Sequence, residues 1–268
     1  MNIVYVLHKT DPTDGSTKAF VNLLNGLIPN GINPIVVLPD KKGIYNTLVK
    51  MAIPTFVTLY KNNRYPYWNT VKNVLLFLPK LVALIAVNRF AVARITKFLR
   101  SFHIDIIHTN VGINSIGFQC AKRLNIPHVY HIREYADVIG MKYFPCQSAF
   151  SKQLASPHSY AVCITKDIHR HYGLTGNAKT TVIYDGIRSR IDTMPTSSRK
   201  PYLLYVGRID PVKGLDVLLR GYKTYKEQLS AQEVLPLYVA GDESHPIYAS
   251  KIYKYVDENG LSNNITFL

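Results

Sequence analysis

The chain has 268 residues, of which 47% are hydrophobic, and a net charge of +15. This length and composition exclude a disordered chain and leave room for two α/β units. The three cysteines, Cys120, Cys146 and Cys163, lie far apart, which argues against a disulfide framework or a cysteine zinc site and favours a reducing compartment. The first residues, MNIVYVLH, predict a strand and no signal peptide.

Strands and helices alternate through the first 187 residues. A strand at 2–8 precedes a helix that begins after Gly15 and Ser16, and strands at 35–39 and 54–59 flank a helix at 44–51. Alternation of this kind predicts a parallel, doubly wound sheet. Further strands are expected at 105–110, 127–134, 159–165 and 180–187, with a helix at 112–124.

Polar residues follow several of these strands at their carboxyl ends, where open α/β sheets bind ligands. His131 is followed by a cation and an acid, and it is either catalytic or structural. The pair Asp185–Gly186 either lines a cleft or forms a plain turn, and His108 and His128 are expected in the core. The candidate ligand residues of this edge are Gly15, Ser16, Asn110, His131, Arg133, Glu134, Asp185 and Gly186.

The charge excess lies in the amino-terminal part. Residues 1–199 hold 24 Lys and Arg against nine Asp and Glu, whereas residues 200–268 hold eight of each. Between 41 and 104 there are 11 Lys and Arg and no acid. The apolar run at 74–87 is too short to span a bilayer.

This stretch nevertheless has the composition of a surface that rests on anionic lipid. Arg89, Lys97 and Arg100 fall within about 80° of helical arc, and Trp68 lies just upstream. We therefore expect peripheral contact with an anionic membrane. The alternatives are a buried helix with a solvated basic face and, less favoured because the aromatics do not alternate with the cations, a nucleic-acid surface.

Residues 188–200 have the composition of a linker, so the predicted domains are 1–187 and 201–268. The second domain repeats the α/β alternation, but its 68 residues are fewer than the roughly 100 of a doubly wound domain, so it is expected to be incomplete. Its first strand, YLLYV at 202–206, is expected to be buried on both faces of a parallel sheet.

A tight turn and a helix follow that strand. Gly207 ends the strand, and Arg208 and Lys213 lie between it and the helix, where two cations suit a diphosphate or are ordinary loop cations. Asp242, after a later strand, is a further ligand candidate. No His or Asp partner accompanies it in the sequence, and no metal site is expected.

The segment VGRIDPVKGLDVLL at 206–219 is similar to the strand-turn-helix signature of the family-four retaining glycosyltransferases, which have the two-domain GT-B fold. TVIYDGI, YVAGDES, NITFL, IIHTN and the Gly15–Ser16 loop agree with it, and HVYHIRE looks like the strand end of members that build bacterial capsule and exopolysaccharide. A dinucleotide fold is disfavoured because no G-x-G-x-x-G follows any strand.

The resemblance implies two Rossmann-like units and a hexose transferred with retention from a nucleotide-diphosphate sugar to a lipid-linked or glycan acceptor. Arg208, Lys213 and the Gly15–Ser16 backbone would bind the phosphates in a cleft between the domains, with His131 beside the sugar. The acceptor would bind the amino-terminal domain, no cofactor or metal would be needed, and the protein would be cytoplasmic at the inner membrane face.

Two departures from the family pattern stand out. Asp185 replaces the usual Asn, and the family's E-x7-E segment is expected after residue 268. The alternative to an active transferase is therefore a truncated, non-catalytic remnant that binds membrane or acceptor. The incomplete sheet is expected to expose apolar surface and an edge.

Overall fold

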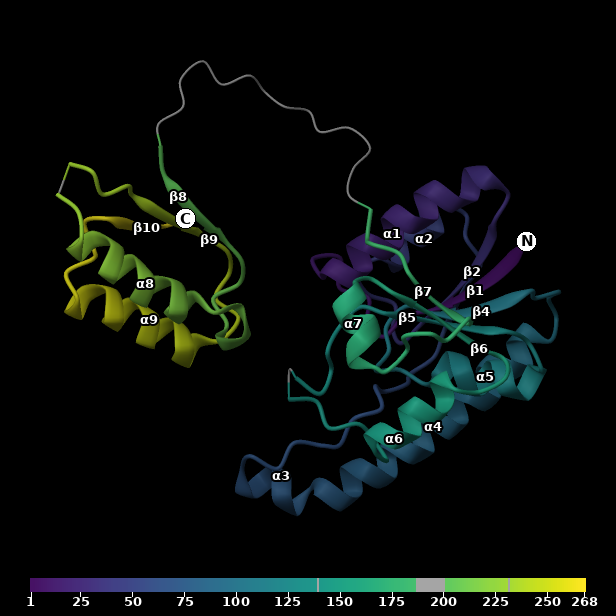
Figure 1. Ribbon diagram of the computed structural model, residues 1–268. Coiled ribbons are helices and arrows are strands. Elements are labelled where there is room, and N and C mark those ends of the chain that lie inside the picture. Colours follow the sequence, from purple (N-terminus) through teal and green to yellow (C-terminus); the bar gives the residue numbers. More distant parts are fainter. Residues whose placement is uncertain (139, 187–200, 231) are drawn as a thin grey trace. The chain divides into compact units, whose positions relative to one another are not determined.

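The computed structural model describes residues 1–138, 140–186, 201–230 and 232–268 (Figure 1). The chain divides into two compact units, Met1–Arg190 and Ile191–Leu268. The division falls inside the predicted linker, 188–200, which lies outside the described residues.

The first unit is built on a seven-stranded parallel sheet with the order β3-β2-β1-β4-β5-β6-β7. The order shows that the chain winds outward from β1 to one edge, returns to β4 and then winds to the other edge. Ligands of such sheets bind at the carboxyl ends of the strands near the reversal, here β1 and β4. The strands are β1 (Asn2–Val6), β2 (Asn33–Leu38), β3 (Thr55–Val57), β4 (Ile106–Thr109), β5 (His128–Ile132), β6 (Ser159–Cys163) and β7 (Thr180–Val182).

Helices cover both faces of this sheet, because successive strand residues point to opposite sides. Ile3 and Tyr5 of β1 pack with α1 and α2, whereas Val4 and Val6 pack with α4 and α5 (Figure 1). The sheet is therefore doubly wound, as predicted. The described helices of this unit are α1 (Gly15–Leu27), α2 (Tyr45–Lys50), α3 (Val71–Leu75), α4 (Phe77–Leu99), α5 (Ile116–Leu124), α6 (Gln147–Leu154) and α7 (Lys166–His171).

Most boundaries agree with the sequence prediction, but the strand expected at 180–187 ends at Val182, and other features also differ. The helix expected at 112–124 begins only at Ile116, whose N–H donates to the Asn114 side chain. The short helices α6 and α7 are not among the predicted elements.

The apolar region 71–99 forms two helices that break at Leu76. Pro79 accounts for the break, since its ring conflicts with the carbonyl four residues earlier and is tolerated in the first turn of a new helix. Among the described residues, neither α4 nor any other helix has the length and apolar character to cross a bilayer.

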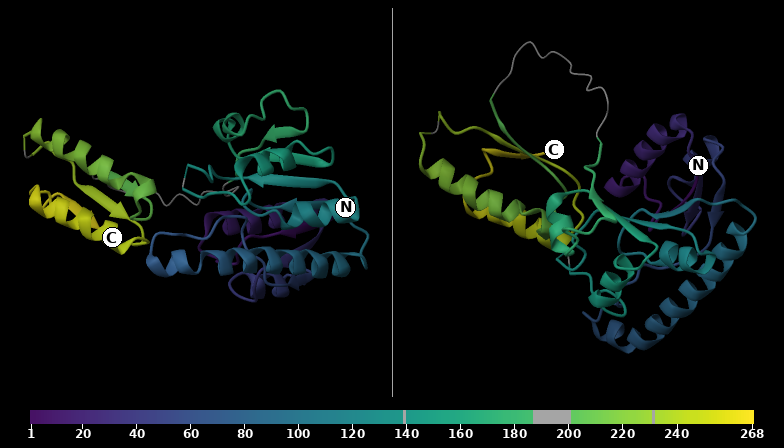
Figure 2. Two further views of the ribbon diagram at one scale, coloured as in Figure 1. Left: turned by 90° about the horizontal axis from the view of Figure 1, so that it is seen from below. Right: turned by 45° about the vertical axis from the view of Figure 1, so that its right-hand side comes forward.

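The second unit is a three-stranded parallel sheet in the order β10-β9-β8. Helices α8 and α9 lie side by side on one face, as Figure 1 and the right-hand view of Figure 2 show. Leu215 and Leu219 of α8 and Ile252 of α9 form its core with Val239 of β9. The elements are β8 (Leu203–Val206), α8 (Leu215–Glu227), β9 (Leu237–Ala240), α9 (Pro246–Glu258) and β10 (Ile265–Phe267).

The prediction that the first strand of this unit is buried on both faces is wrong. Leu204 and Val206 of β8 are 50% and 77% exposed, and β8 is an edge strand. The uninterrupted apolar run resembled a central parallel strand, but both helices of the unit pack on the opposite face. Apolar surface and a sheet edge are exposed, as the sequence predicted.

Candidate functional site

The carboxyl edge of the first sheet carries a set of polar residues that are joined to one another by hydrogen bonds and ion pairs. At the end of β1, Lys9 forms an ion pair with Asp14, and the Asp14 carboxylate caps α1 by accepting from the Ser16 N–H and hydroxyl. The start of α1 is therefore already satisfied by a carboxylate. Gly15, at the start of α1, is exposed.

Asn110 joins the end of β4 to α1. Its backbone N–H donates to Val6 O (3.0 Å), and its side-chain Nδ2 donates to Ser16 O (3.1 Å). Its Oδ1 is buried and has no hydrogen-bond partner in the described part of the chain. Asn110 therefore fixes the α1 loop on the sheet while leaving one acceptor unused at the ligand edge.

Arg133, directly after β5, is the centre of this polar set. Its side chain is 5% exposed, and its Nε donates to Asn110 O (3.2 Å). One terminal nitrogen donates to both Asp185 oxygens, and the other lies 3.2 Å from His131 Nδ1. The ion pair explains why a carboxylate at position 185 suits this chain where the family pattern has an amide.

The contact with Arg133 also assigns the tautomer of His131. Arginine can only donate, so His131 Nδ1 accepts and the ring proton lies on Nε2. Burial, and secondarily the Arg133 charge, lower the pKa of His131 to about 3, so the ring is neutral near pH 7. Its Nε2 is buried without a hydrogen-bond partner among the described residues, 4.0 Å from Asp185 Oδ1. His131 thus presents an unused donor.

Glu134 directly follows Arg133 in the sequence. Burial raises its pKa to about 7, with a further contribution from Asp14 that Lys9 opposes. Its Oε1 is buried and lacks a partner within the described ranges. Glu134 is therefore close to half-protonated near neutral pH.

His131 opens into a hollow of about 400 Å³ between α1 and the end of β7. Arg133, Tyr184, Asp185 and Gly186 line it with residues of α1. The structure therefore brings together, on one side of the ligand edge, the predicted residues His131, Arg133, Asp185 and Gly186. His108 is buried behind them with its ring 5.4 Å from that of His131, which agrees with its predicted core position.

A second hollow, of about 430 Å³, lies at the ends of β1 and β3. His8, at the end of β1, lines it, and burial followed by the Lys9 charge lowers its pKa to about 4. The sequence analysis did not single out His8, although its position after the first strand was a usable signal. The other lining residues are Tyr60, Lys61, Asn62, Arg64, Tyr65, Pro66, Tyr67, Asn73, Lys80 and Leu84.

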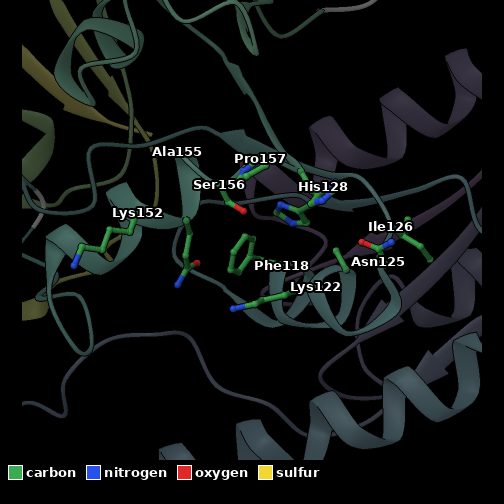
Figure 3. A pocket seen from close by; sticks show the side chains of 12 residues that line it. Phe118, Lys122, Asn125, Ile126, His128, Lys152, Ala155, Ser156 and Pro157 are labelled. Atoms are coloured by element: carbon green, nitrogen blue, oxygen red, sulfur yellow. The ribbon is translucent and has the colours of Figure 1, made fainter.

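A third hollow, of about 670 Å³, lies at the opposite edge, where β5 and β6 begin (Figure 3). Phe118 lies at its centre, Lys122 and Lys152 lie at its rim, and His128 and Ser156 close its far side. His128 is buried, as predicted for a core residue, and its Nε2 is hydrogen-bonded to Thr109 Oγ1 (2.7 Å). This hollow lies away from the edge where parallel sheets bind ligands.

In the second unit, the segment after β8 has the predicted strand, turn and helix. Asp210 caps a 3₁₀ turn, Pro211–Lys213, and Gly214 adopts φ 69° before α8 begins at Leu215. Arg208 and Lys213 are exposed on this turn, and neither forms an ion pair within the described residues. Two cations are therefore available at the carboxyl end of β8.

The turns after β8 and β9 are in close contact. Gly207 N–H donates to Ala240 O and Ile209 N–H donates to Asp242 O, both at 2.9 Å. A Cβ on Gly241, whose φ is 150°, would lie 2.1 Å from Gly207 O. Asp242 thus supports the cationic turn through its backbone, while its exposed side chain has no hydrogen-bond or ion-pair partner among the residues that the structure describes. In the described residues, no three His, Cys, Asp or Glu side chains converge as a metal site would need.

The predicted membrane residues lie along α4 and before α3. Arg89, Lys97 and Arg100 are exposed, and Trp68 is 56% exposed. The carboxyl half of α4 packs on the sheet through Val92 and Ile95. The cations therefore lie on the solvent side of a core helix.

Solved structures resemble this chain, although no protein-family model and no curated protein matches it. Anabaena HepE, crystallised with UDP, has a TM-score of 0.70 and 18% identity over 100% of this chain and 69% of that one. A Rickettsia africae glycosyltransferase has a TM-score of 0.69 and 16% identity, over 100% of this chain and 67% of that one. The lipopolysaccharide outer core galactosyltransferase WaaB has a TM-score of 0.64 and 15% identity, over 100% of this chain and 67% of that one. The likeness confirms the predicted α/β fold of the GT-B class.

Proposed function

We propose that the chain is a glycosyltransferase that uses a nucleoside-diphosphate sugar as donor. The observation that carries the proposal is the turn after β8, where Arg208 and Lys213 are exposed beside a parallel strand end and the start of α8. Guanidinium and ammonium groups at such an edge suit a diphosphate. Two further points support this: HepE was crystallised with UDP, and segment 206–219 resembles the glycosyltransferase signature.

The two cations would act mainly on the leaving group. As the acceptor oxygen bonds to the anomeric carbon, the bond from that carbon to the diphosphate breaks and its electron pair passes to the diphosphate, which takes the acceptor proton. Arg208 and Lys213 stabilise the charge that develops there, which is greatest in the transition state. In this mechanism the cations fill the role of a metal, and no metal or other cofactor is proposed.

His131 would hold the donor sugar. Its neutral ring offers the Nε2 proton to a sugar hydroxyl in the 400 Å³ hollow, and Asp185 beside it can accept from a second hydroxyl. Arg133 and Asn110 keep the ring in place, and Glu134, Gly186 and Asp242 complete the ligand edges of the two units. The turn at Gly15 and Ser16 would reach a phosphate through Gly15 N–H.

The finer assignments follow the family resemblance. We propose transfer of a hexose with retention to a lipid-linked or glycan acceptor of a bacterial polysaccharide, at the inner face of the plasma membrane. The amino-terminal unit would bind the acceptor, and the unit after the linker would bind the nucleotide. The exposed Trp68 and the acid-free stretch support peripheral contact with anionic lipid.

Release of nucleoside diphosphate from a panel of uridine and guanosine diphosphate sugars tests the function. The full chain should release product from at least one donor, and His131→Ala should lower kcat about 10²-fold or more. His103→Ala, which removes an exposed imidazole at the opposite end of β4, is the control. Donor binding without turnover would favour the non-catalytic remnant, and absence of both would refute the proposal.

Vesicle co-sedimentation tests the membrane contact. Neutralising Arg89, Lys97 and Arg100 to Gln should weaken binding to anionic vesicles by up to about 1 kcal/mol per cation at low salt. Binding that keeps its full strength in the triple variant would exclude these cations from the contact.

A further inference from the structure

The 670 Å³ hollow at the amino ends of β5 and β6 is larger than either hollow at the ligand edge, which measure about 430 and 400 Å³. It lies between the end of α5 and the turn that leads from α6 into β6 (Figure 3). Parallel sheets bind the substrates of their reactions at the opposite edge. The proposed transfer reaction therefore leaves this hollow without a role.

Backbone hydrogen bonds fix both walls of the hollow. On one wall, Asn125 adopts φ 56° and ends α5, and the Ile126 N–H donates to Ala121 O (3.0 Å). On the other wall, the His128 N–H donates to His158 O (2.8 Å). Because the fold itself holds these segments in place, a ligand that enters the hollow does not have to order them.

Phe118 of α5 provides an aromatic surface at the centre of the hollow (Figure 3). Its ring stacks on the buried Tyr130 at a centroid distance of 6.2 Å, and it packs at 5.7 Å against His128 in a T-shaped arrangement. Phe118 is half-buried, so part of its ring faces the hollow. A flat ring can stack on that part.

His128, which lines the hollow, carries an unused hydrogen-bond donor. The fully buried Thr109 hydroxyl has no partner other than His128 Nε2 among the described residues, so it donates to that nitrogen. Burial lowers the pKa of His128 well below its ordinary value, so the ring is neutral and its single proton lies on Nδ1. Nδ1 is buried and lacks a partner within the described ranges. A buried donor left in this way points to a ligand.

Amide and hydroxyl groups also line the hollow. The Tyr130 hydroxyl donates to Gln153 Oε1 (2.5 Å), which fixes the Gln153 amide at the side of the hollow. The side chains of Asn125 and Ser156 belong to the same lining. Such groups suit the mixed donors and acceptors along the edge of a nucleobase and the hydroxyls of a ribose.

Two cations lie at the rim, and no acid accompanies them. Lys122 and Lys152 are exposed, and neither forms an ion pair within the described residues. No Asp or Glu lines the hollow, and the sequence has none at 106–133 or at 138–166, the segments that form both walls. Two ammonium groups without a competing carboxylate suit a phosphate, which carries close to two negative charges near pH 7.

We infer that this hollow is a second ligand site, which binds a nucleoside monophosphate. The base stacks on Phe118, with its polar edge toward Gln153 and His128. The phosphate lies between Lys122 and Lys152. The site belongs to the first unit, whereas the turn proposed to bind the diphosphate of the donor belongs to the second, so the inference does not depend on the proposed function.

Smaller anions suit the hollow less well. Inorganic phosphate would pair with the cations but would leave the Phe118 ring and the amides unused. An aromatic carboxylate with one ring would bring one charge to two cations and would fill only part of the 670 Å³. A nucleoside without phosphate would leave both ammonium groups unpaired.

Titration calorimetry of the full chain with AMP, GMP, CMP and UMP tests the inference. At least one monophosphate should bind tenfold or more tightly than its own nucleoside and than inorganic phosphate, because only the monophosphate reaches both the ring and the cations. The titration is repeated on the variant Arg208→Ala with Lys213→Ala, in which the turn of the second unit lacks its cations. Binding of the monophosphate should be unchanged there.

Three variants locate the site. Lys122→Gln with Lys152→Gln should weaken the monophosphate about tenfold and leave the nucleoside unaffected. Phe118→Leu, which keeps an apolar side chain without the ring, should weaken the monophosphate and the nucleoside by a similar factor, about tenfold. Ala155→Glu places a carboxylate on an exposed residue of the lining and should weaken the monophosphate at least tenfold.

The matched control is Lys50→Gln with Lys97→Gln, which removes the same charge from exposed positions elsewhere in the unit and should leave the affinity unchanged. Thermal unfolding of each variant confirms that it is folded, and the rim and Ala155 variants decide the result if Phe118→Leu does not fold. Three outcomes would overturn the inference: no monophosphate that exceeds its nucleoside and inorganic phosphate, a preference that survives in the rim variant, or binding that is lost with Arg208 and Lys213.

Discussion

Replacing Arg133 by Met should disrupt the polar set at the ligand edge of the first unit. The guanidinium donates to Asn110 O, His131 Nδ1 and both oxygens of Asp185, and only 5% of the side chain is exposed. Met keeps the apolar volume of the stem but removes every donor. Any loss of stability in this variant therefore reports the hydrogen bonds and the charge.

The expected loss can be worked from these contacts. A hydrogen bond that involves a charged group contributes roughly 1.5–3 kcal/mol. The Asp185 side chain is 38% exposed, so water screens its pair with Arg133 to about 1 kcal/mol. Together with the unpaired Asn110 carbonyl, Arg133→Met should cost about 3 kcal/mol, and Asp185→Asn about 1 kcal/mol.

Urea unfolding of the two single variants and the double variant measures these losses of unfolding free energy. The single tryptophan, Trp68, lies in the first unit and stacks on Phe77, so its fluorescence reports on that unit. The coupling energy between positions 133 and 185 should be about 1 kcal/mol. Additivity within about 0.3 kcal/mol would refute the ion pair.

The same variant tests the His131 tautomer. In the unchanged protein, imidazole nitrogen resonances should show a neutral ring with its proton on Nε2 near pH 7. Arg133→Met should raise the pKa of His131, because one positive charge is removed, but burial should hold it below 6.5. A wild-type ring protonated on Nδ1 would contradict the assigned contact.

Two further predictions concern Glu134 and the contact between the turns of the second unit. The folded pKa of Glu134, about 7, lies above its ordinary 4.5, so its contribution to stability is complete below pH 4.5 and is lost as pH rises through 7. Glu134→Gln should therefore raise the unfolding free energy by about 3 kcal/mol at pH 8 and change it little at pH 4; equal effects at both pH values would contradict the shift. Gly241→Ala should destabilise the second unit by more than about 2 kcal/mol, seen as faster hydrogen exchange in β9, because its Cβ meets Gly207 O. Gly221→Ala, in α8 with nothing within 4 Å, should instead stabilise the unit by up to about 1 kcal/mol, and similar effects of the two changes would refute the close contact.

The parallel sheets were predictable because apolar runs such as 2–8 and 35–39 alternate with segments that carry an apolar helical face, such as the one after Gly15 and Ser16. The same reasoning placed His131, Arg133 and Asp185 at strand ends, and strand ends of a parallel sheet share an edge. The exposure of Val206 was not predictable, since a run such as YLLYV does not show how many helices cover the sheet.

The partnerships within the site also depend on tertiary structure. Asp185 and Arg133 are 52 positions apart, and nothing local indicates that the carboxylate meets the guanidinium. Asp14 could be recognised from the sequence as a helix cap. Its ion pair with Lys9 could not be predicted, because it depends on how the loop between β1 and α1 folds. The 430 Å³ hollow at the ends of β1 and β3 escaped sequence reasoning because Lys61 and Lys80 both line it only when Asn88 fixes the loop to α4.

The affinity of the full chain for UDP and GDP, measured by titration calorimetry, tests the central claim most directly. Arg208→Ala and Lys213→Ala should each weaken the better nucleotide by tenfold or more, since each removes a charged contact to the diphosphate. Lys251→Ala, which removes an exposed charge from the middle of α9, should leave that affinity unchanged. Unaltered affinity in both turn variants, or no binding of either nucleotide by the unchanged chain, would contradict the account.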